Sequence, residues 1–104
     1  MTSVFKALAD PTRRKVLQLL QRGPMTAGEL ADFFDVSKPT MSAHFAVLVA
    51  AGLMEAEKNG RSITYRIKIS VLEEALLGFA QTFNLKVLRD SHNKPVAKSA
   101  KERS

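Results

Sequence analysis

The side chains that could do chemistry in this chain gather on one short stretch, Val36 to Gly52, and what they offer is hydrogen bonding. With about 100° per residue, one side of a helix over this stretch is apolar and carries Met41, Phe45, Leu48 and Gly52. The other side carries Pro39, Thr40, Ser42, Ala43, Ala46 and Val47. These side chains are short and uncharged, whereas an ordinary surface helix carries Glu, Lys and Gln there. We therefore expect another molecule to lie close against this side.

Groups for catalysis or metal binding are scarce. The two histidines, His44 and His92, stand in different contexts, and neither lies near a nucleophile in a recognisable motif. Asp32 and Asp35 have a spacing that is usual on a solvated helix face, and the chain has no glycine-rich phosphate loop. The sequence contains no cysteine, which excludes disulfides and thiolate metal sites. We expect no enzymatic activity and no cofactor.

The elements that position this stretch can be located from their start and stop signals. Ser37 can cap a helix through its hydroxyl, Pro39 is tolerated in the first turn, and Gly52 suits the left-handed residue that closes a helix. Before it, Thr26 and Glu29 form a capping box that opens a short helix to about Phe34. Two helices joined by a tight turn, the second with a clean outer face, predict a helix-turn-helix.

Two further helices are expected ahead of this motif. Residues 2–9 place apolar side chains at helical spacing. Asp10 as N-cap and Pro11 at the first helical position start the next helix, and Gly23-Pro24 ends it. Its buried stripe is predicted to be Val16, Leu17 and Leu20.

After Gly52 the apolar period changes from about 3.6 to about 2, which indicates strands. Residues 53–58 form one predicted strand, Asn59-Gly60 its two-residue turn, and the second strand carries Ile63, Tyr65, Ile67 and Ile69 on one side. A basic hairpin after a helix-turn-helix is a wing, with Lys58, Asn59 and Arg61 at its tip. The predicted fold is therefore mostly α with a small β-hairpin wing: four helices, two strands and a fifth helix.

The predicted fifth helix, residues 71–89, has one unbroken apolar stripe. This is more apolar surface than a peripheral helix on a small monomer needs, and a chain of this size covers extra surface easily by dimerising. We expect a dimer interface made by this helix and residues 2–9, consisting of Val4, Phe5, Leu8, Leu72, Ala75, Leu76, Phe79 and Phe83.

The 104 residues suggest one domain, residues 1–90, followed by a basic tail, residues 91–104, that we expect to be disordered. Sixteen Lys and Arg against ten Asp and Glu give a formal charge of +6, which favours a polyanionic partner. The N-terminus lacks the apolar core of a signal peptide, and no apolar run is long enough to span a bilayer. We expect a cytoplasmic protein without a membrane partner.

Three segments carry a family resemblance: ADPTRRKVLQLL, TAGELADFFDVSKPTMSAHFAVLVAAGLM and NGRSITYRI. They resemble the ArsR/SmtB family of bacterial winged-helix repressors, and within it the group around the autorepressor of the sporulation-delaying operon. The resemblance implies a homodimer joined through the first and last helices, bound to a double-stranded DNA operator of imperfect two-fold symmetry. It also implies that the second helix of the motif enters the major groove while the wing reaches toward the minor groove.

The chain departs from the family where metal-sensing members hold their ligands. Those members place cysteines just after Glu-Leu, whereas here Glu29-Leu30 is followed by Ala31-Asp32-Phe33. The last helix offers Glu73 and Glu74 but no histidine. The departure favours a metal-independent repressor. The alternatives are the same repressor gated by an unrecognised small ligand or metal at the dimer interface, and a winged-helix module for protein–protein contact.

The candidate DNA contacts are Ser37, Lys38, Pro39, Thr40, Ser42, Ala43, His44, Lys58, Asn59 and Arg61. The helix face carries no Arg, Asn or Gln, the side chains that read bases with two hydrogen bonds. Recognition would then depend on hydroxyls, on contacts to the thymine methyl and on DNA shape. His44 lies at the edge of the face, and a packed histidine is an equal alternative. Arg61 is expected to contact phosphate or the minor groove, rather than be only a solvated turn residue.

The run Arg13-Arg14-Lys15 needs a partner, because cations in the first turns of a helix oppose its dipole. A salt bridge to an acid such as Glu55 or Glu73 is favoured over a DNA contact. The basic tail is interpreted as a solubilising end, with non-specific attraction to DNA as the alternative.

Overall fold

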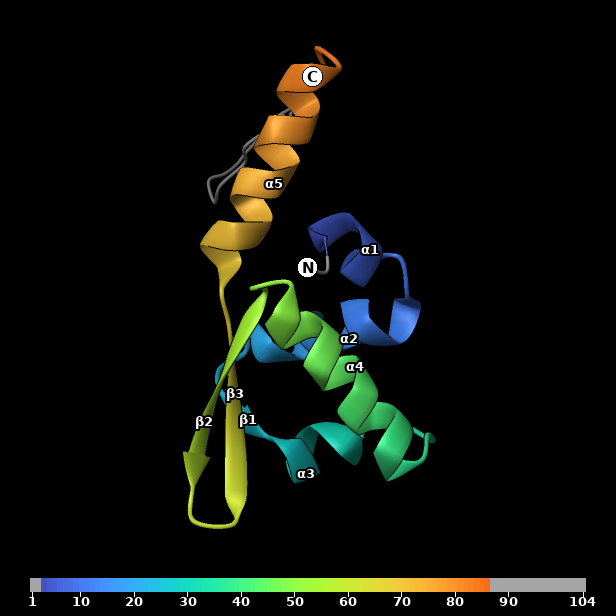
Figure 1. Cartoon of the computed structure of the whole chain (residues 1–104), viewed down its shortest axis with the longest axis vertical. Coiled ribbons are helices and arrows are strands. Elements are labelled where there is room, and N and C mark those ends of the chain that lie inside the picture. Colours follow the sequence, from blue (N-terminus) through green and yellow to red (C-terminus); the bar gives the residue numbers. More distant parts are fainter. Residues whose placement is uncertain (1–2, 87–104) are drawn as a thin grey trace, which may run out of the picture.

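The computed structural model describes residues 3–86 of the chain (Figure 1). It confirms the predicted fold class and adds one short strand. The elements in order are α1 (Val4–Leu8), α2 (Pro11–Leu20), β1 (Met25–Thr26), α3 (Ala27–Ala31), α4 (Lys38–Ala50), β2 (Met54–Asn59), β3 (Ser62–Ile67) and α5 (Ile69–Thr82). In Figure 1 the β2–β3 hairpin and α5 point in opposite directions from the body that the other helices form. None of the helices within residues 3–86 has the length and apolar character to cross a membrane.

The sheet has three antiparallel strands in the order β1-β3-β2. The hairpin pairs from Met54↔Ile67 at its base to Asn59↔Ser62 at its tip, so the two-residue turn is Gly60-Arg61 rather than the predicted Asn59-Gly60. Gly60 has φ +60°, which suits the first central position of a hairpin turn. The predicted strand is also too long at its end, because Ile69 already begins α5.

The third strand, β1, was not predicted from the sequence. It pairs with β3 at Met25↔Tyr65 and Thr26↔Thr64, and a strand of two residues has no period to detect. Thr26 therefore has two roles, since it also caps α3. This pairing fixes the wing to the start of the helix-turn-helix.

The core lies where α2, α3, α4 and the base of the wing meet. The stripe predicted on α2 is confirmed, and Leu19 is buried as well. The Phe45 and Tyr65 rings lie 4.8 Å apart between centroids, which joins α4 to β3. Burial raises the pKa of the Tyr65 phenol. The buried members of the core are Ala7, Val16, Leu17, Leu19, Leu20, Leu30, Met41, Phe45, Leu48, Leu53, Met54 and Tyr65.

Helices α2 and α3 begin at the capping residues that the sequence predicts. Asp10 accepts hydrogen bonds from the backbone N–H groups of Thr12, at 2.7 Å, and Arg13, at 3.1 Å. The capping box of α3 is complete, since Thr26 Oγ1 accepts from Glu29 N–H and the Glu29 carboxylate accepts from Thr26 N–H. The predicted end of α3 at Phe34 is wrong. The backbone N–H groups of Phe33 and Phe34 bond three residues back, to Leu30 and Ala31, so the chain tightens into a turn and leaves Phe33 52% exposed.

Helix α5 ends at Thr82, short of the predicted residue 89. Asn84 has φ +56°, the left-handed conformation that closes many helices. The N–H of Leu85 bonds to the Ala80 carbonyl at 2.7 Å, and the N–H of Asn84 bonds to the Gln81 carbonyl at 3.2 Å. This is a Schellman closure with Asn in the position usually held by Gly. Residues 87–90 and the predicted tail, 91–104, lie outside the described residues.

Candidate nucleic-acid interface

Helix α4 begins at the predicted cap. Ser37 Oγ accepts a hydrogen bond from the Thr40 backbone N–H at 3.3 Å and donates to Thr40 Oγ1 at 2.9 Å. Pro39 lies in the first turn, and Gly52, with φ +77°, closes the chain after the helix. The first turn is thus held by its own side chains, which leaves Lys38 and Pro39 exposed at its start.

The two sides of α4 are distributed largely as the sequence predicts. Met41, Phe45 and Leu48 are buried, at 4% exposure or less. The opposite side exposes Pro39, Thr40, Ser42, Ala43 and Ala46. Val47 was predicted on the outer side, and this is wrong, because it lies at the edge and packs partly buried against the core. Without Val47, the side chains on the outer side are even shorter than predicted.

Ser42 is placed where α4 faces α3. It lines a pocket of about 190 Å³ together with Lys38, Met41, Phe45 and three small residues of α3, namely Ala27, Gly28 and Ala31. Small residues on α3 keep this hollow open. The Ser42 hydroxyl is exposed and makes no hydrogen bond within the described part of the chain, so it is available to a partner.

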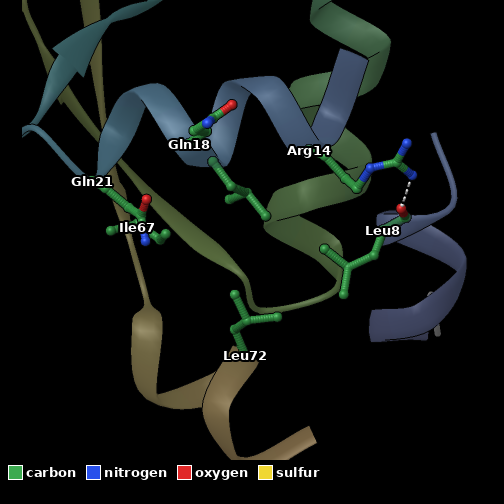
Figure 2. Close-up of a pocket in the computed structure, with 7 residues that line it drawn as sticks. Leu8, Arg14, Gln18, Gln21, Ile67 and Leu72 are labelled. Atoms are coloured by element: carbon green, nitrogen blue, oxygen red, sulfur yellow. Dashed lines mark hydrogen bonds between the residues drawn. The ribbon is translucent and has the colours of Figure 1, made fainter. Parts of the chain in front are cut away.

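The arginines at the start of α2 do not find the predicted acids. Arg13 Nε donates to the Ala7 carbonyl at 2.7 Å and one of its terminal nitrogens donates to the Lys6 carbonyl at 3.1 Å. Arg14 donates to the Leu8 carbonyl at 2.8 Å, as Figure 2 shows. The last carbonyls of α1 have no partner within their own helix, and a cation at a helix C-terminus is favourable. The predicted salt bridge to Glu55 or Glu73 is therefore wrong, and α2 caps α1.

His44 lies half-buried at the edge of α4. Its Nδ1 is 3.2 Å from the other terminal nitrogen of Arg13, so the end of α1, the start of α2 and the middle of α4 meet at one guanidinium. Burial alone would raise the pKa of the nearby Asp10 carboxyl, but the backbone N–H groups of Arg13 and Thr12 and the charge of Arg13 together hold that pKa below its usual value. Asp10 accordingly stabilises the fold above its unfolded-state pKa, and the contribution is lost as the pH falls through the lowered value.

The wing tip is basic and exposed. Lys58, Asn59 and Arg61 are all exposed around the turn. Arg66 and Glu57, farther down the hairpin, form the one ion pair within residues 3–86, at 3.0 Å. Both of its side chains are about half exposed, so the pair adds little stability, and the cations of the tip remain free of acidic partners within that range.

The residues predicted for the dimer interface come together on one side of the molecule. The Phe5 ring of α1 lies 5.2 Å from the Phe79 ring of α5, which lies 4.8 Å from the Phe83 ring, measured between centroids. Yet Phe5, Leu76, Phe79 and Phe83 are 45%, 46%, 45% and 60% exposed. The other predicted members, Val4, Leu8, Leu72 and Ala75, are half-buried. Ile69, Leu77 and Leu85 are further exposed apolar side chains of this region.

A second pocket, of about 210 Å³, lies between the helices of this apolar region and the body (Figure 2). Its wall combines the apolar side chains of Leu8, Leu17, Ile67 and Leu72 with the polar ones of Arg14, Gln18 and Gln21. Residues 3–86 bring no three His, Asp or Glu side chains together as a candidate metal site.

The comparisons with known proteins agree with this geometry. Residues 8–57 match a family model described as a helix-turn-helix domain. The chain is 43% identical to the transcriptional repressor SdpR of Bacillus subtilis over 76 residues, which are 73% of this chain and 84% of SdpR. It is 29% identical to the arsenical resistance operon repressor of Staphylococcus aureus over 101 residues, which are 97% of this chain and 91% of that repressor.

A solved structure of an ArsR-like transcriptional regulator from Rhodococcus superposes with a TM-score of 0.69 at 34% identity, over 78% of this chain and 76% of that one. Sequence and fold thus point to one group of proteins, whose members are DNA-binding regulators rather than enzymes. This chain belongs to the ArsR/SmtB family of winged-helix transcriptional repressors.

Proposed function

We propose that this repressor acts as a homodimer that recognises a specific operator of imperfect two-fold symmetry and does so without a metal. The observation that carries the proposal is the pairing of two unlike surfaces on one small chain. One is the short, neutral outer side of α4 beside a basic wing tip, and the other is the exposed apolar side of α1 and α5. The first suits DNA, and the second suits another copy of the chain.

In the proposed complex, α4 enters the major groove and the wing follows the backbone toward the minor groove. Short side chains on α4 allow its backbone to approach the base edges, and the hydroxyls of Thr40 and Ser42 are the polar groups within reach. Lys58 and Arg61 would contact phosphate or the minor groove. The proposed contact set is Ser37, Lys38, Pro39, Thr40, Ser42, Ala43, His44, Lys58, Asn59 and Arg61.

The proposed dimer covers the apolar side of α1 and α5. A large apolar side chain gains about 1.5–3 kcal/mol when it is fully removed from water, and at least four that are close to half exposed lie together here. A two-fold dimer would present two copies of α4 to DNA, and the operator would then carry two related half-sites. The remaining alternative, a protein-interaction module, would place larger apolar groups on the outer side of α4.

Metal independence is proposed from the residues at the family's ligand positions. The chain has no cysteine, and Ala31, Asp32 and Phe33 follow Glu29-Leu30. The names of several relatives refer to arsenical or mercury resistance, and those specificities belong to the relatives.

Selection of DNA from a random-sequence pool tests the proposal, with the selected operator then titrated by fluorescence anisotropy. We expect a recurring sequence with two related half-sites, bound with unchanged affinity in micromolar zinc, copper or nickel. Recovery of unrelated sequences would overturn specific recognition. A stoichiometric release by one of the metals, reversed by a chelator, would overturn metal independence.

The pocket in Figure 2 favours one second candidate, the same repressor gated by a small ligand. It joins α1 and α5 of the proposed dimer to α2 and β3 of the DNA-binding body. Its size suits a molecule of about a substituted benzene, and Arg14 at its wall would favour an acid. Benzoate and hexanoate are suitable probes. If a probe releases the protein from the operator and Gln18→Trp prevents that release, this candidate is supported. If neither probe changes the affinity for the operator, the result counts against it.

A further inference from the structure

The contact between Arg13 and His44 sets the hydrogen-bonding state of a side chain on the DNA-facing helix. An arginine guanidinium only donates hydrogen bonds and stays protonated in proteins. Its terminal nitrogen lies 3.2 Å from His44 Nδ1, so Nδ1 must be the acceptor. The ring is then neutral and carries its proton on Nε2.

The guanidinium is held in this position from several directions. Its Nε and its second terminal nitrogen donate to the carbonyls of Ala7 and Lys6, at 2.7 and 3.1 Å. The backbone N–H of Arg13 is fixed by Asp10 Oδ1 at 3.1 Å. Because the guanidinium is planar, two bonds to α1 orient the third N–H toward His44. The state of the imidazole is thus dictated by the end of α1.

We propose that Arg13 is a positioning residue for DNA binding, which holds His44 in the Nε2-protonated form so that Nε2–H is a donor offered to the DNA. The inference rests on the proposed docking of α4. Within residues 3–86 no protein group forms a hydrogen bond with Nε2, and the ring is only half-buried beside the exposed Ala43 and Thr40. The DNA group addressed is a hydrogen-bond acceptor, either a phosphate oxygen or an acceptor on a base edge.

The same arrangement links the two proposed surfaces of the chain. Residues 6 and 7, whose carbonyls hold Arg13, belong to α1, and Phe5 of α1 packs on Phe79 of α5. A shift of α1 in the dimer would therefore move the guanidinium away from Nδ1. Arg13 therefore enforces the Nε2–H form on α4 only while α1 is seated.

The first test uses the free protein and requires no DNA. Long-range ¹H–¹⁵N spectra distinguish the two neutral imidazole forms and the protonated one. We expect His44 of the wild type to be in the Nε2–H form at neutral pH, and Arg13→Ala to remove that bias. Arg14→Ala is the matched control, because Arg14 also caps α1, through the Leu8 carbonyl, without a hydrogen bond to α4 (Figure 2). An Nδ1–H form in the wild type, or no change in Arg13→Ala, would overturn the proposal.

The second test measures affinity for operator and random DNA. His44→Ala should weaken binding about 5- to 10-fold, the usual value of one hydrogen bond. His44→Gln, which keeps an N–H near the Nε2 position, should stay within about 2-fold of the wild type. Arg13→Ala should lose affinity in the wild type but almost none in the His44→Ala background, because the two groups act as a unit. Equal losses of affinity for operator and random DNA would identify a phosphate oxygen as the acceptor. A loss of affinity for the operator alone would identify an acceptor on a base.

Additive losses from Arg13→Ala and His44→Ala would show that Arg13 acts only through stability and would overturn the proposal. Should Arg13→Ala fail to fold, Arg13→Lys replaces it, because lysine keeps the charge but cannot donate along the three fixed directions of the fork. Failure of the docking itself is recognised separately. In that case Arg61→Ala and Ser42→Ala would also leave affinity unchanged, while the imidazole spectra would still report on Arg13.

Discussion

Helices α4 and α5 have nearly the same length, 13 and 14 residues, but opposite relations to the rest of the chain. Helix α4 buries Met41, Phe45 and Leu48, and after Lys38 at its start the side chains on its outer side are short and neutral. Helix α5 buries only Ala80 and exposes Leu76 and Phe79, and Phe83 directly after it is exposed as well. The apolar side of α4 is completed by its own chain, whereas that of α5 is not. A helix such as α5 needs an apolar partner, whereas a helix such as α4 can accept a polar one.

The placement of the helices explains this difference. Helix α4 packs against α2 and β2 within the body. Helix α5 projects from the body (Figure 1): Val71 and Leu72 at its start pack partly buried against the core, and Phe79 farther along meets Phe5 of α1. Large apolar patches on soluble proteins mark interaction sites. The four predictions below test whether the two helices really serve different partners, and they run from the largest expected effect to the smallest.

Phe79→Glu should break the dimer. The substitution places a charge without a counter-charge in the proposed apolar interface, at a cost of about 3–5 kcal/mol. Light scattering should show a monomer, and operator affinity should fall at least 100-fold. Gln81→Glu is the control, because it adds the same charge on an exposed residue about 200° around the helix. A dimer that survives Phe79→Glu would mean that α5 is not the interface.

Leu48→Ala and Leu76→Ala compare the two helices directly. Leu48 is fully buried, so its truncation should lower the free energy of unfolding by about 2–5 kcal/mol. Leu76 is 46% exposed, so the same change should cost below about 1 kcal/mol in the monomer. Urea denaturation in the Phe79→Glu background removes the contribution of dimerisation from both values. Equal losses in that background would contradict the proposed contrast between α4 and α5.

Arg61→Ala should weaken binding to operator and to random DNA alike, by about 1.5–3 kcal/mol, because it removes a charged hydrogen bond to the backbone or minor groove. If the contact is to phosphate, the log–log salt slope should become shallower by about one unit. Lys68→Ala, a cation at the base of the wing, is the control. A loss confined to the operator would mean that the wing reads sequence.

Ser42→Ala should reduce discrimination between operator and random DNA by about 1 kcal/mol and leave the salt slope nearly unchanged. The hydroxyl contributes a neutral hydrogen bond, and no counter-ion is released with it. Ser70→Ala, on an exposed serine of α5, should change neither quantity. If Ser42 set the salt slope and Arg61 the discrimination, the proposed docking of helix and wing would be reversed.

Local signals in the sequence predicted most of the fold. Asp10, Thr26 with Glu29, and Ser37 each cap the helix that they were expected to begin, because a capping side chain acts within three residues. The end of α5 was harder to predict. Asn84 adopts the left-handed conformation that usually marks glycine, and the apolar residues after it prolong the helical pattern.

Contacts between distant residues were not predicted, because no local pattern encodes them. Arg13 and Arg14 were expected to need acids, but they bind carbonyls six or seven residues earlier. The 31-residue separation of Arg13 and His44 likewise gives no sequence signal. The residues proposed to contact DNA were named from the start and outer side of one helix and from the wing tip, and the structure adds their exposure and neighbours. Only Val47 moves from that side to the core edge.

The uneven width of the sheet has a consequence for how the wing opens and closes with time. Strand β1 supports β3 only at Tyr65 and Thr64, and the pairs beyond them, Lys58↔Ile63 and Asn59↔Ser62, belong to a two-stranded ladder. A two-stranded ribbon opens at a low free-energy cost. Amide hydrogens near Tyr65 should therefore exchange with solvent slowly, and those of the outer pairs quickly. Binding of DNA by Arg61 would slow the outer amides, at an entropic cost that the three-stranded part at Tyr65 and Thr64 does not incur.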